Sequence, residues 1–118
     1  VRAWGTDFEW RVAMLRIYDV LLELIRSVRE LVKELERRDP DLARQCRRAF
    51  SSAVLNMAEG GYSRGKNRAA RYHTAVGSLR EALACFEVGA ALGYLPEVDS
   101  ELRRRGSVSD SVYGAAVL

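Results

Sequence analysis

The chain has 118 residues, of which 48% are hydrophobic and 30% are charged, and its net charge is +3. This length fits one domain that buries roughly 65% of the unfolded chain's surface, and the composition excludes intrinsic disorder. No apolar stretch approaches the ~20 residues that a membrane-spanning helix needs, and the first five residues lack the apolar core of a secretory signal. We therefore expect a cytoplasmic protein with a single domain over residues 1–118.

The first predicted element is a long amphipathic helix over about residues 7–38. Apolar residues recur here in steps of three and four, which is the period of a helical face. Two neighbouring apolar rows result: Phe8, Val12, Leu15, Tyr18, Leu22, Ile25, Val28, Val32 and Leu35, and Met14, Ile17, Leu21, Leu24, Val28, Leu31 and Leu35. We expect one face to enter the core and part of the other to contact another subunit.

Three further helices are predicted over about residues 40–60, 65–92 and 96–116. Asp39-Pro40 supplies a cap and a first helical residue for the second helix, and Gly60-Gly61 ends it. The third helix keeps its apolar spacing until Gly93. The last has a weaker pattern, because Gly106 and nearby serines interrupt it.

The short connections favour helices that reverse direction at each turn. The sequence therefore predicts an all-α fold, an antiparallel up-down-up-down four-helix bundle. The alternative is a three-helix core with a frayed C-terminal helix that needs a partner.

The charge is unevenly distributed along the chain. Residues 1–39 are neutral, residues 40–80 carry +6, and residues 81–118 carry −3. The basic candidates for nucleic-acid binding are Arg44, Arg47, Arg48, Arg64, Lys66, Arg68 and Arg71, with Arg80 and Arg103–Arg105 as possible extensions. Such residues bind RNA or DNA phosphates electrostatically, without sequence specificity. Equally, they keep a helix face soluble and pair with acidic residues of neighbouring helices. Membrane binding is disfavoured because no exposed aromatic face is present.

Two polar pairs interrupt the apolar pattern, Asn56 with Glu59 and Ser78 with Glu81. If the chain reverses near residue 63, the two carboxylates differ in height by roughly 20 Å, which is too far for one acid/base site. We expect ion pairs that fix helix register as buried or half-buried charges. The expected pairs are Glu59 with Arg68 or Arg71, and Glu81 with Arg47 or Arg48.

Residues suited to catalysis or metal binding are sparse. His73 is the only histidine, and Cys46 and Cys85 have no ligand spacing, so we expect no metal and two buried cysteines. No serine lies in a G-x-S-x-G elbow, and the glycines near residue 60 lack the spacing of a phosphate-binding loop. We expect no enzymatic activity and no cofactor.

Three motifs carry a resemblance to a known family. They are N-x-A-E-G at residues 56–60, G-S-x-x-E at residues 77–81, and Gly93-Tyr94 at the end of the third predicted helix. In order and spacing they resemble the bacterial four-helix-bundle proteins encoded in intervening sequences of large-subunit ribosomal RNA genes, over about residues 8 to 112. That family is related to the accessory variability determinant proteins of diversity-generating retroelements.

The resemblance implies a bundle that assembles into a ring, commonly a homopentamer, without catalytic activity. The related branch implies binding to nucleic acid and to a reverse transcriptase. The signature positions carried over are Asn56, Glu59, Gly60, Ser78 and Glu81, with an implied structural role. Two hypotheses result: a non-enzymatic, homo-oligomeric nucleic-acid-binding accessory protein, and a protein-interaction scaffold with no nucleic-acid role.

Overall fold

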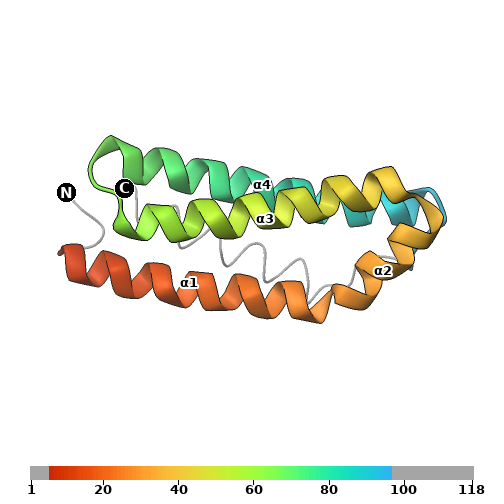
Figure 1. The fold of residues 1–118 in the computed structure, drawn as a ribbon, viewed down its shortest axis with the longest axis horizontal. Helices are drawn as coiled ribbons and strands as arrows, with labels where there is room; N and C mark the ends of the chain where they lie inside the picture. The colour runs from red at the N-terminus through yellow and green to blue at the C-terminus, as the bar shows by residue number, and fades with distance from the viewer. Residues whose placement is uncertain (1–5, 97–118) are drawn as a thin grey trace.

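The computed structural model describes residues 6–96, which form four helices joined by short connections (Figure 1). The helices are α1 (Asp7–Ser27), α2 (Arg29–Arg38), α3 (Pro40–Tyr62) and α4 (Lys66–Ala91). No β-strand occurs within these residues, so the predicted all-α four-helix bundle is confirmed. The helix expected over residues 96–116 lies outside the described residues, except for its first residue. None of the four helices is long and apolar enough to cross a membrane.

The single helix expected over residues 7–38 is divided at Val28. This residue has φ −105° and ψ 5°, and its N–H donates to the carbonyl of Leu24 at 3.1 Å. Helical bonding resumes at once, because Val32 N donates to Val28 O at 3.0 Å. In Figure 1, α2 turns away from the line of α1 and towards α3. Val28 and Leu35 are both buried, so the apolar period continues across the break.

Local sequence determines where α1 and α3 begin. Thr6 Oγ1 accepts from Glu9 N at 3.0 Å, and the Glu9 carboxylate accepts from Thr6 N at 3.2 Å, which forms a capping box. Asp39 Oδ1 accepts from Leu42 N at 3.1 Å, and Pro40 occupies the first helical position of α3.

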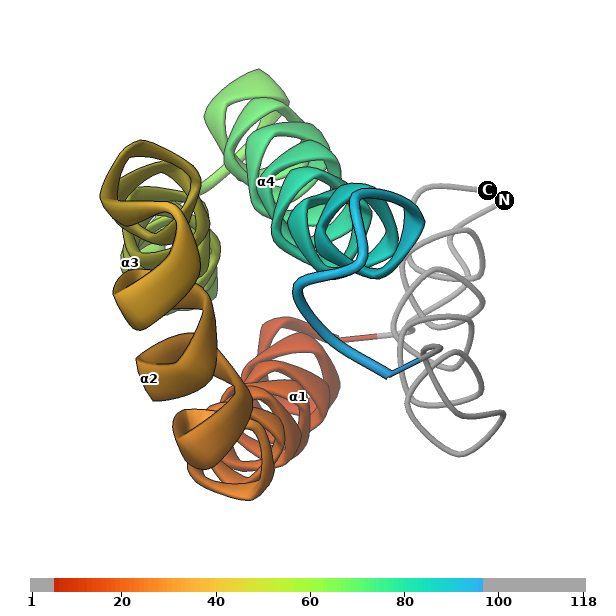
Figure 2. The same ribbon diagram turned by 90° about the vertical axis from the view of Figure 1, so that its right-hand side faces the viewer.

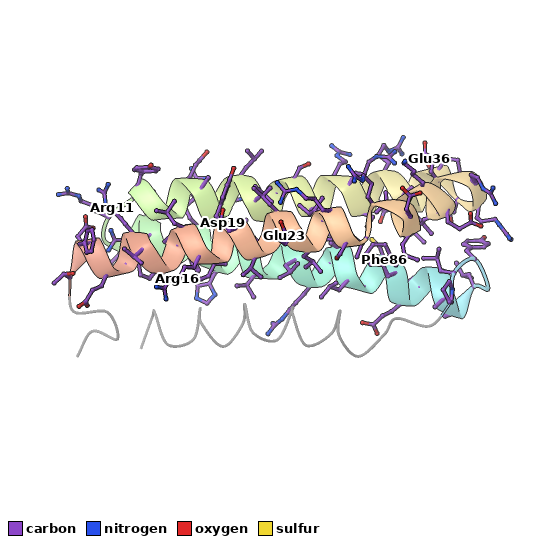
Figure 3. All side chains as sticks on the ribbon, turned by 90° about the horizontal axis from the view of Figure 1, so that it is seen from below. Arg11, Arg16, Asp19, Glu23, Glu36 and Phe86 are labelled. Carbon is purple, nitrogen blue, oxygen red and sulfur yellow. The ribbon has the colours of Figure 1, made fainter. Side chains whose placement is uncertain are left out.

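The core fills the space between α1, α3 and α4, and the largest helix contact is between α3 and α4 (Figure 2). The buried side chains of the three long helices include Trp10, Ala13, Met14, Ile17, Leu21 and Leu24 on α1; Ala43, Cys46, Ala49, Phe50, Ala53 and Met57 on α3; and Tyr72, Ala75, Val76, Leu79, Ala82, Cys85 and Phe86 on α4. The second apolar row of the first predicted helix is therefore the core row. In Figure 3, which looks onto α1, the exposed residues Arg16, Asp19 and Glu23 lie along the same helix.

Candidate nucleic-acid interface

The structure separates the predicted nucleic-acid-binding residues into two groups. One group, Arg44, Arg47 and Arg48, lies in the first half of α3, and the other, Arg64, Lys66, Arg68 and Arg71, lies at the turn from α3 to α4 and on the first turns of α4. At 1.5 Å per residue, Arg48 is about 21 Å from Tyr62, the last residue of α3, and Arg64 and Lys66 lie beyond that end. Arg64 and Lys66 therefore do not share a compact site with the group at the start of α3.

Four of the seven residues already pair with carboxylates. The pairs are Arg44 with Asp41 at 3.0 Å, Arg47 with Glu36 at 2.9 Å, Arg71 with Glu59 at 2.8 Å, and Arg68 with Asp7. Arg48, Arg64 and Lys66 are exposed and make no ion pair with any of residues 6–96. Pairing between elements, which the sequence left as an alternative role for the arginines, thus applies to Arg47, Arg68 and Arg71.

The turn from α3 to α4 combines basic side chains with a helix start. Residues 60–80 contain five Lys and Arg residues and no Asp or Glu. Gly65 precedes α4 with φ 61°, a conformation that favours glycine, and no side chain caps the first N–H groups of α4. Because a helix N-terminus carries partial positive charge, the backbone adds to the field of Arg64 and Lys66.

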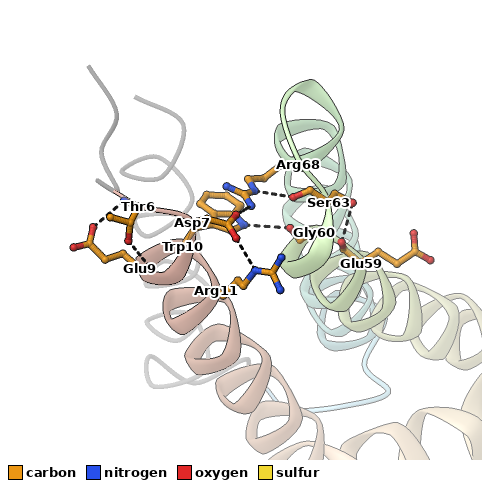
Figure 4. A network of polar contacts seen from close by, with 9 residues as sticks. All are labelled: Thr6, Asp7, Glu9, Trp10, Arg11, Glu59, Gly60, Ser63 and Arg68. Atoms are coloured by element: carbon orange, nitrogen blue, oxygen red, sulfur yellow. Dashed lines mark hydrogen bonds and ion pairs between the residues drawn. The ribbon is translucent and has the colours of Figure 1, made fainter.

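Beside this turn, α1, α3 and α4 meet in a polar junction around Trp10 (Figure 4). Trp10 is buried, and its Nε1 donates to the carbonyl of Gly60 at 3.1 Å. The Arg68 guanidinium lies 4.7 Å from the centroid of the Trp10 ring, and Arg68 Nε donates to Ser63 O at 2.9 Å. The last carbonyls of a helix have no intrahelical partner. Trp10 and Arg68 thus supply donors to the end of α3 and to the turn after it.

The acidic member of the junction is Asp7. The hydrogen bond from Arg68 lowers the pKa of the Asp7 carboxyl below its ordinary value, and Arg11, at 2.8 Å, lowers it further. Asp7 thus stays charged and offsets the charge of Arg68, whose side chain is only 20% exposed. Arg68 is therefore a structural residue of the junction, and Arg64 and Lys66 carry the exposed charge beside it.

Three of the family-signature residues form a chain of polar contacts between α3 and α4. Ser52 Oγ and Ser78 Oγ are 2.7 Å apart, and Asn56 Nδ2 donates to the carbonyl of Ser52 at 2.8 Å. Asn56 Oδ1 accepts from Arg71 at 3.1 Å, and Arg71 also pairs with Glu59. The predicted Glu59–Arg71 pair is confirmed. This arrangement agrees with the structural role that the resemblance implies.

Gly60, the fourth signature residue, allows close packing. A Cβ at this position would lie 3.1 Å from Cδ2 of Tyr72 and 3.5 Å from Cβ of Arg71. Tyr72 is fully buried, and its ring makes an edge contact with Trp10 at a centroid distance of 5.1 Å. Only glycine fits this contact without displacing the aromatic pair.

The expectations for Glu81 are wrong. Arg47 pairs with Glu36 instead, because α2 bends over α3 after Val28 and brings that carboxylate within reach. Glu81 is exposed and makes no ion pair with any residue of the described range 6–96. Glu59 is also exposed, so neither carboxylate fixes helix register as a buried or half-buried charge.

Cys46 and Cys85 are buried, as predicted. Burial raises the pKa of the Cys46 thiol to about 12, and the neighbouring Cys85 adds to the rise. Burial also raises the pKa of Cys85. Among residues 6–96, no group of three or more His, Cys, Asp or Glu side chains is arranged to hold a metal ion. Neither cysteine is thus poised as a thiolate nucleophile or metal ligand.

The fold and the junction place the chain among small helical-bundle proteins. In this bundle, polar signature residues connect α3 with α4. The family model described as "23S rRNA-intervening sequence protein" matches residues 13–106. The chain belongs to this family, which confirms the resemblance seen in its motifs. That match says nothing of diversity-generating retroelements. Comparisons with curated proteins and with solved structures found no match.

Proposed function

We propose that the protein is a non-enzymatic, homo-oligomeric accessory protein that binds RNA at the turn from α3 to α4. The observation that carries this proposal is that residues 60–80 contain five Lys and Arg residues and no Asp or Glu, with Arg64 and Lys66 exposed on either side of Gly65. Neither has a carboxylate partner within residues 6–96, so both are available to phosphates. The family's link to ribosomal RNA genes supports RNA as the polymer.

The recognition proposed is electrostatic. Lys and Arg contacts to phosphates release counterions, so the logarithm of the binding constant falls by about 0.7 to 0.9 per contact for each unit of log salt. Exposed ion pairs such as Arg44–Asp41 contribute at most about 1 kcal/mol, so phosphates compete for these arginines as well. DNA is expected to bind in the same manner, because the contacts are to the backbone and not to bases.

The test is a titration of labelled structured RNA at several salt concentrations. The double variant Arg64→Glu/Lys66→Glu should bind less tightly and show a salt slope smaller by about 1.4 to 1.8, the loss of two contacts. The control Arg16→Glu/Arg26→Glu changes the net charge equally, but on α1, and should bind nearly as the wild type does. Equal binding by the double variant and the control would refute the proposed surface.

The group at the start of α3 needs its own variant. If assembly places both basic groups on one surface, Arg44→Glu/Arg47→Glu/Arg48→Glu, which reverses three charges, should abolish RNA binding at moderate salt. Retained binding by this triple variant would restrict the interface to the turn.

The second candidate is a protein-interaction scaffold with no nucleic-acid role. It is favoured by the carboxylate pairs of Arg44, Arg47, Arg68 and Arg71, which leave three of the seven candidates without a partner among residues 6–96. A pull-down from the native host separates the two. Recovery of one protein without nucleic acid supports the scaffold, and recovery of a reverse transcriptase with RNA supports the accessory role implied by the related branch.

A further inference from the structure

Tyr62, the last residue of α3, places an exposed aromatic ring beside the basic turn. It is 75% exposed, so the burial of its ring contributes little to the stability of the fold. The guanidinium of Arg11, which belongs to α1, lies 5.3 Å from the centroid of this ring. Because a cation–π contact at an exposed site is weak, packing within the subunit does not account for the tyrosine.

Arg11 is held beside Tyr62 by a second contact. Its Nε donates to the Asp7 carboxylate at 2.8 Å, and Asp7 also accepts from Arg68. Figure 4 shows Arg11 extending from α1 towards the end of α3. The ion pair thus positions a planar guanidinium next to a phenol ring that is open to solvent. Nucleobases stack on both kinds of group.

Both residues of this contact line a hollow of about 360 Å³ between α1 and α3. The two methionines of the chain, Met14 and Met57, also line it, together with Leu15 and Tyr18. Methionine thioethers are polarisable and make favourable contacts with aromatic rings. The volume is at the lower end of the range of about 300–1,000 Å³ for small-molecule sites. The hollow therefore has room for one planar base and not for a much larger ligand.

The charge around the hollow suits a phosphate-bearing ligand. Among residues 6–96, no Asp or Glu lines it, and Arg11 does. The exposed Arg64 and Lys66 are two and four residues beyond Tyr62, which limits their backbone separation from it to about 7 Å and 14 Å. A ligand that combines a planar ring with neighbouring phosphates matches both the aromatic hollow and these cations.

We propose that this hollow binds an unpaired base of RNA, which stacks on Tyr62 while Arg64 and Lys66 contact the adjacent phosphates. Bases inside a duplex are covered on both faces by their neighbours, so the site takes a base from a single strand, a loop or a bulge. Stacking is tolerant of sequence, because every base has a π-face. The inference rests on the RNA binding of the proposed function and adds one base contact to its phosphate contacts.

The test compares a single-stranded RNA that carries 2-aminopurine with a blunt RNA duplex of the same length. Stacking on an aromatic ring quenches the fluorescence of 2-aminopurine. The variants are Tyr62→Ala, which removes the ring, and Tyr62→Phe, which keeps it. The matched control is Phe8→Ala, because Phe8 is 74% exposed and does not line the hollow. Circular dichroism verifies helicity, and light scattering gives the mass of each variant.

Tyr62→Ala should bind the single strand about 5- to 140-fold more weakly than the wild type, without quenching. Its salt slope should be unchanged, because no phosphate contact is lost. Its affinity for the duplex should also be unchanged, which a general defect in folding would not produce. Tyr62→Phe and Phe8→Ala should behave as the wild type does with both RNAs.

Equal single-strand binding by Tyr62→Ala and the wild type, or an equal loss of affinity for both RNAs, would overturn the base site. A changed oligomeric mass of Tyr62→Ala would also overturn it, because another subunit would then cover the ring. Displacement of the strand by an equal concentration of AMP would replace RNA with a free nucleotide as the occupant.

The failure of the base site differs from the failure of the proposed function. If only the base site is wrong, salt-dependent binding and the effect of Arg64→Glu/Lys66→Glu persist, and Tyr62→Ala changes nothing. If the proposed function is wrong, the wild type binds neither RNA at low salt, and the base site is refuted with it.

Discussion

The sharpest test of the junction is a pair of glycine substitutions in helices, Gly60→Ala and Gly77→Ala. Alanine in a helix interior is favoured over glycine by about 1 kcal/mol. At Gly77, which is exposed, an added Cβ meets nothing within 4 Å. Gly77→Ala should therefore stabilise the protein by about 0.5–1 kcal/mol.

At Gly60 the same methyl group meets Tyr72 Cδ2 at 3.1 Å. Tyr72 cannot retreat easily, because it is fully buried and its ring contacts Trp10. Overpacking of this kind costs about 1–3 kcal/mol, which cancels or exceeds the gain in helix propensity. Gly60→Ala should thus be less stable than Gly77→Ala by about 1–3 kcal/mol.

The measurement is thermal unfolding followed by circular dichroism. For a chain of this size about 1 kcal/mol corresponds to roughly 4 °C in Tm, so the two Tm values should differ by at least that amount. Subunit concentration must be equal in all samples, because self-association stabilises the folded state. If Gly60→Ala raised Tm as much as Gly77→Ala, the close packing of α3 on Tyr72 would not restrict this position.

Three further predictions concern the junction and the buried thiols. Trp10→Phe keeps an aromatic ring but removes the donor to Gly60 O and part of the buried indole. Chemical denaturation should therefore show a loss of at least about 1 kcal/mol, and no loss would mean that neither the hydrogen bond nor the indole packing stabilises the junction. Asp7 has a folded-state pKa below its ordinary 3.8, so its stabilising effect is present above that value and is lost as the pH falls through the lowered pKa. Denaturation between pH 5 and 2 should therefore show a smaller loss of stability for Asp7→Asn than for the wild type, and parallel curves would contradict the role of Arg68. The Cys46 pKa of about 12 leaves about one thiolate in ten thousand at pH 8. In an alkylation time course followed by mass spectrometry, Cys46 should therefore react slowly in native protein and quickly in unfolded protein. Fast labelling of Cys46 in native protein would show that α3 and α4 separate.

Much of the fold could be predicted from the spacing of apolar residues and from the residues at helix ends. The row from Met14 to Leu24 has the helical period and is buried, and Asp39-Pro40 begins α3 where a cap and a proline predict it. The break at Val28 was not predictable, because the apolar period runs through it without a glycine or a proline. Missing that break also led to the wrong partner for Arg47.

For the candidate site, the sequence predicted which basic residues take part but not how they are arranged. Charge counting found the basic run around Arg64 and Lys66, but it gave no sign that Arg68 is held by Trp10 and Asp7. Trp10 lies four residues before Met14, in phase with the buried row, but its acceptor is Gly60, 50 residues further along the chain. A contact between such distant positions depends on how the helices pack, which local patterns do not report.

The distance in sequence between Asp7 and Arg68 has a consequence for the order of folding. The α3–α4 hairpin closes through neighbours in the chain, whereas α1 completes its contacts only with groups about sixty positions later, which makes its docking a slower, less local step. During synthesis, α1 is made before Gly60 and Arg68. Until then the indole N–H of Trp10 lacks its acceptor, and the apolar face of α1 has no core to enter. We therefore expect α1 to be among the last of the four helices to reach its place.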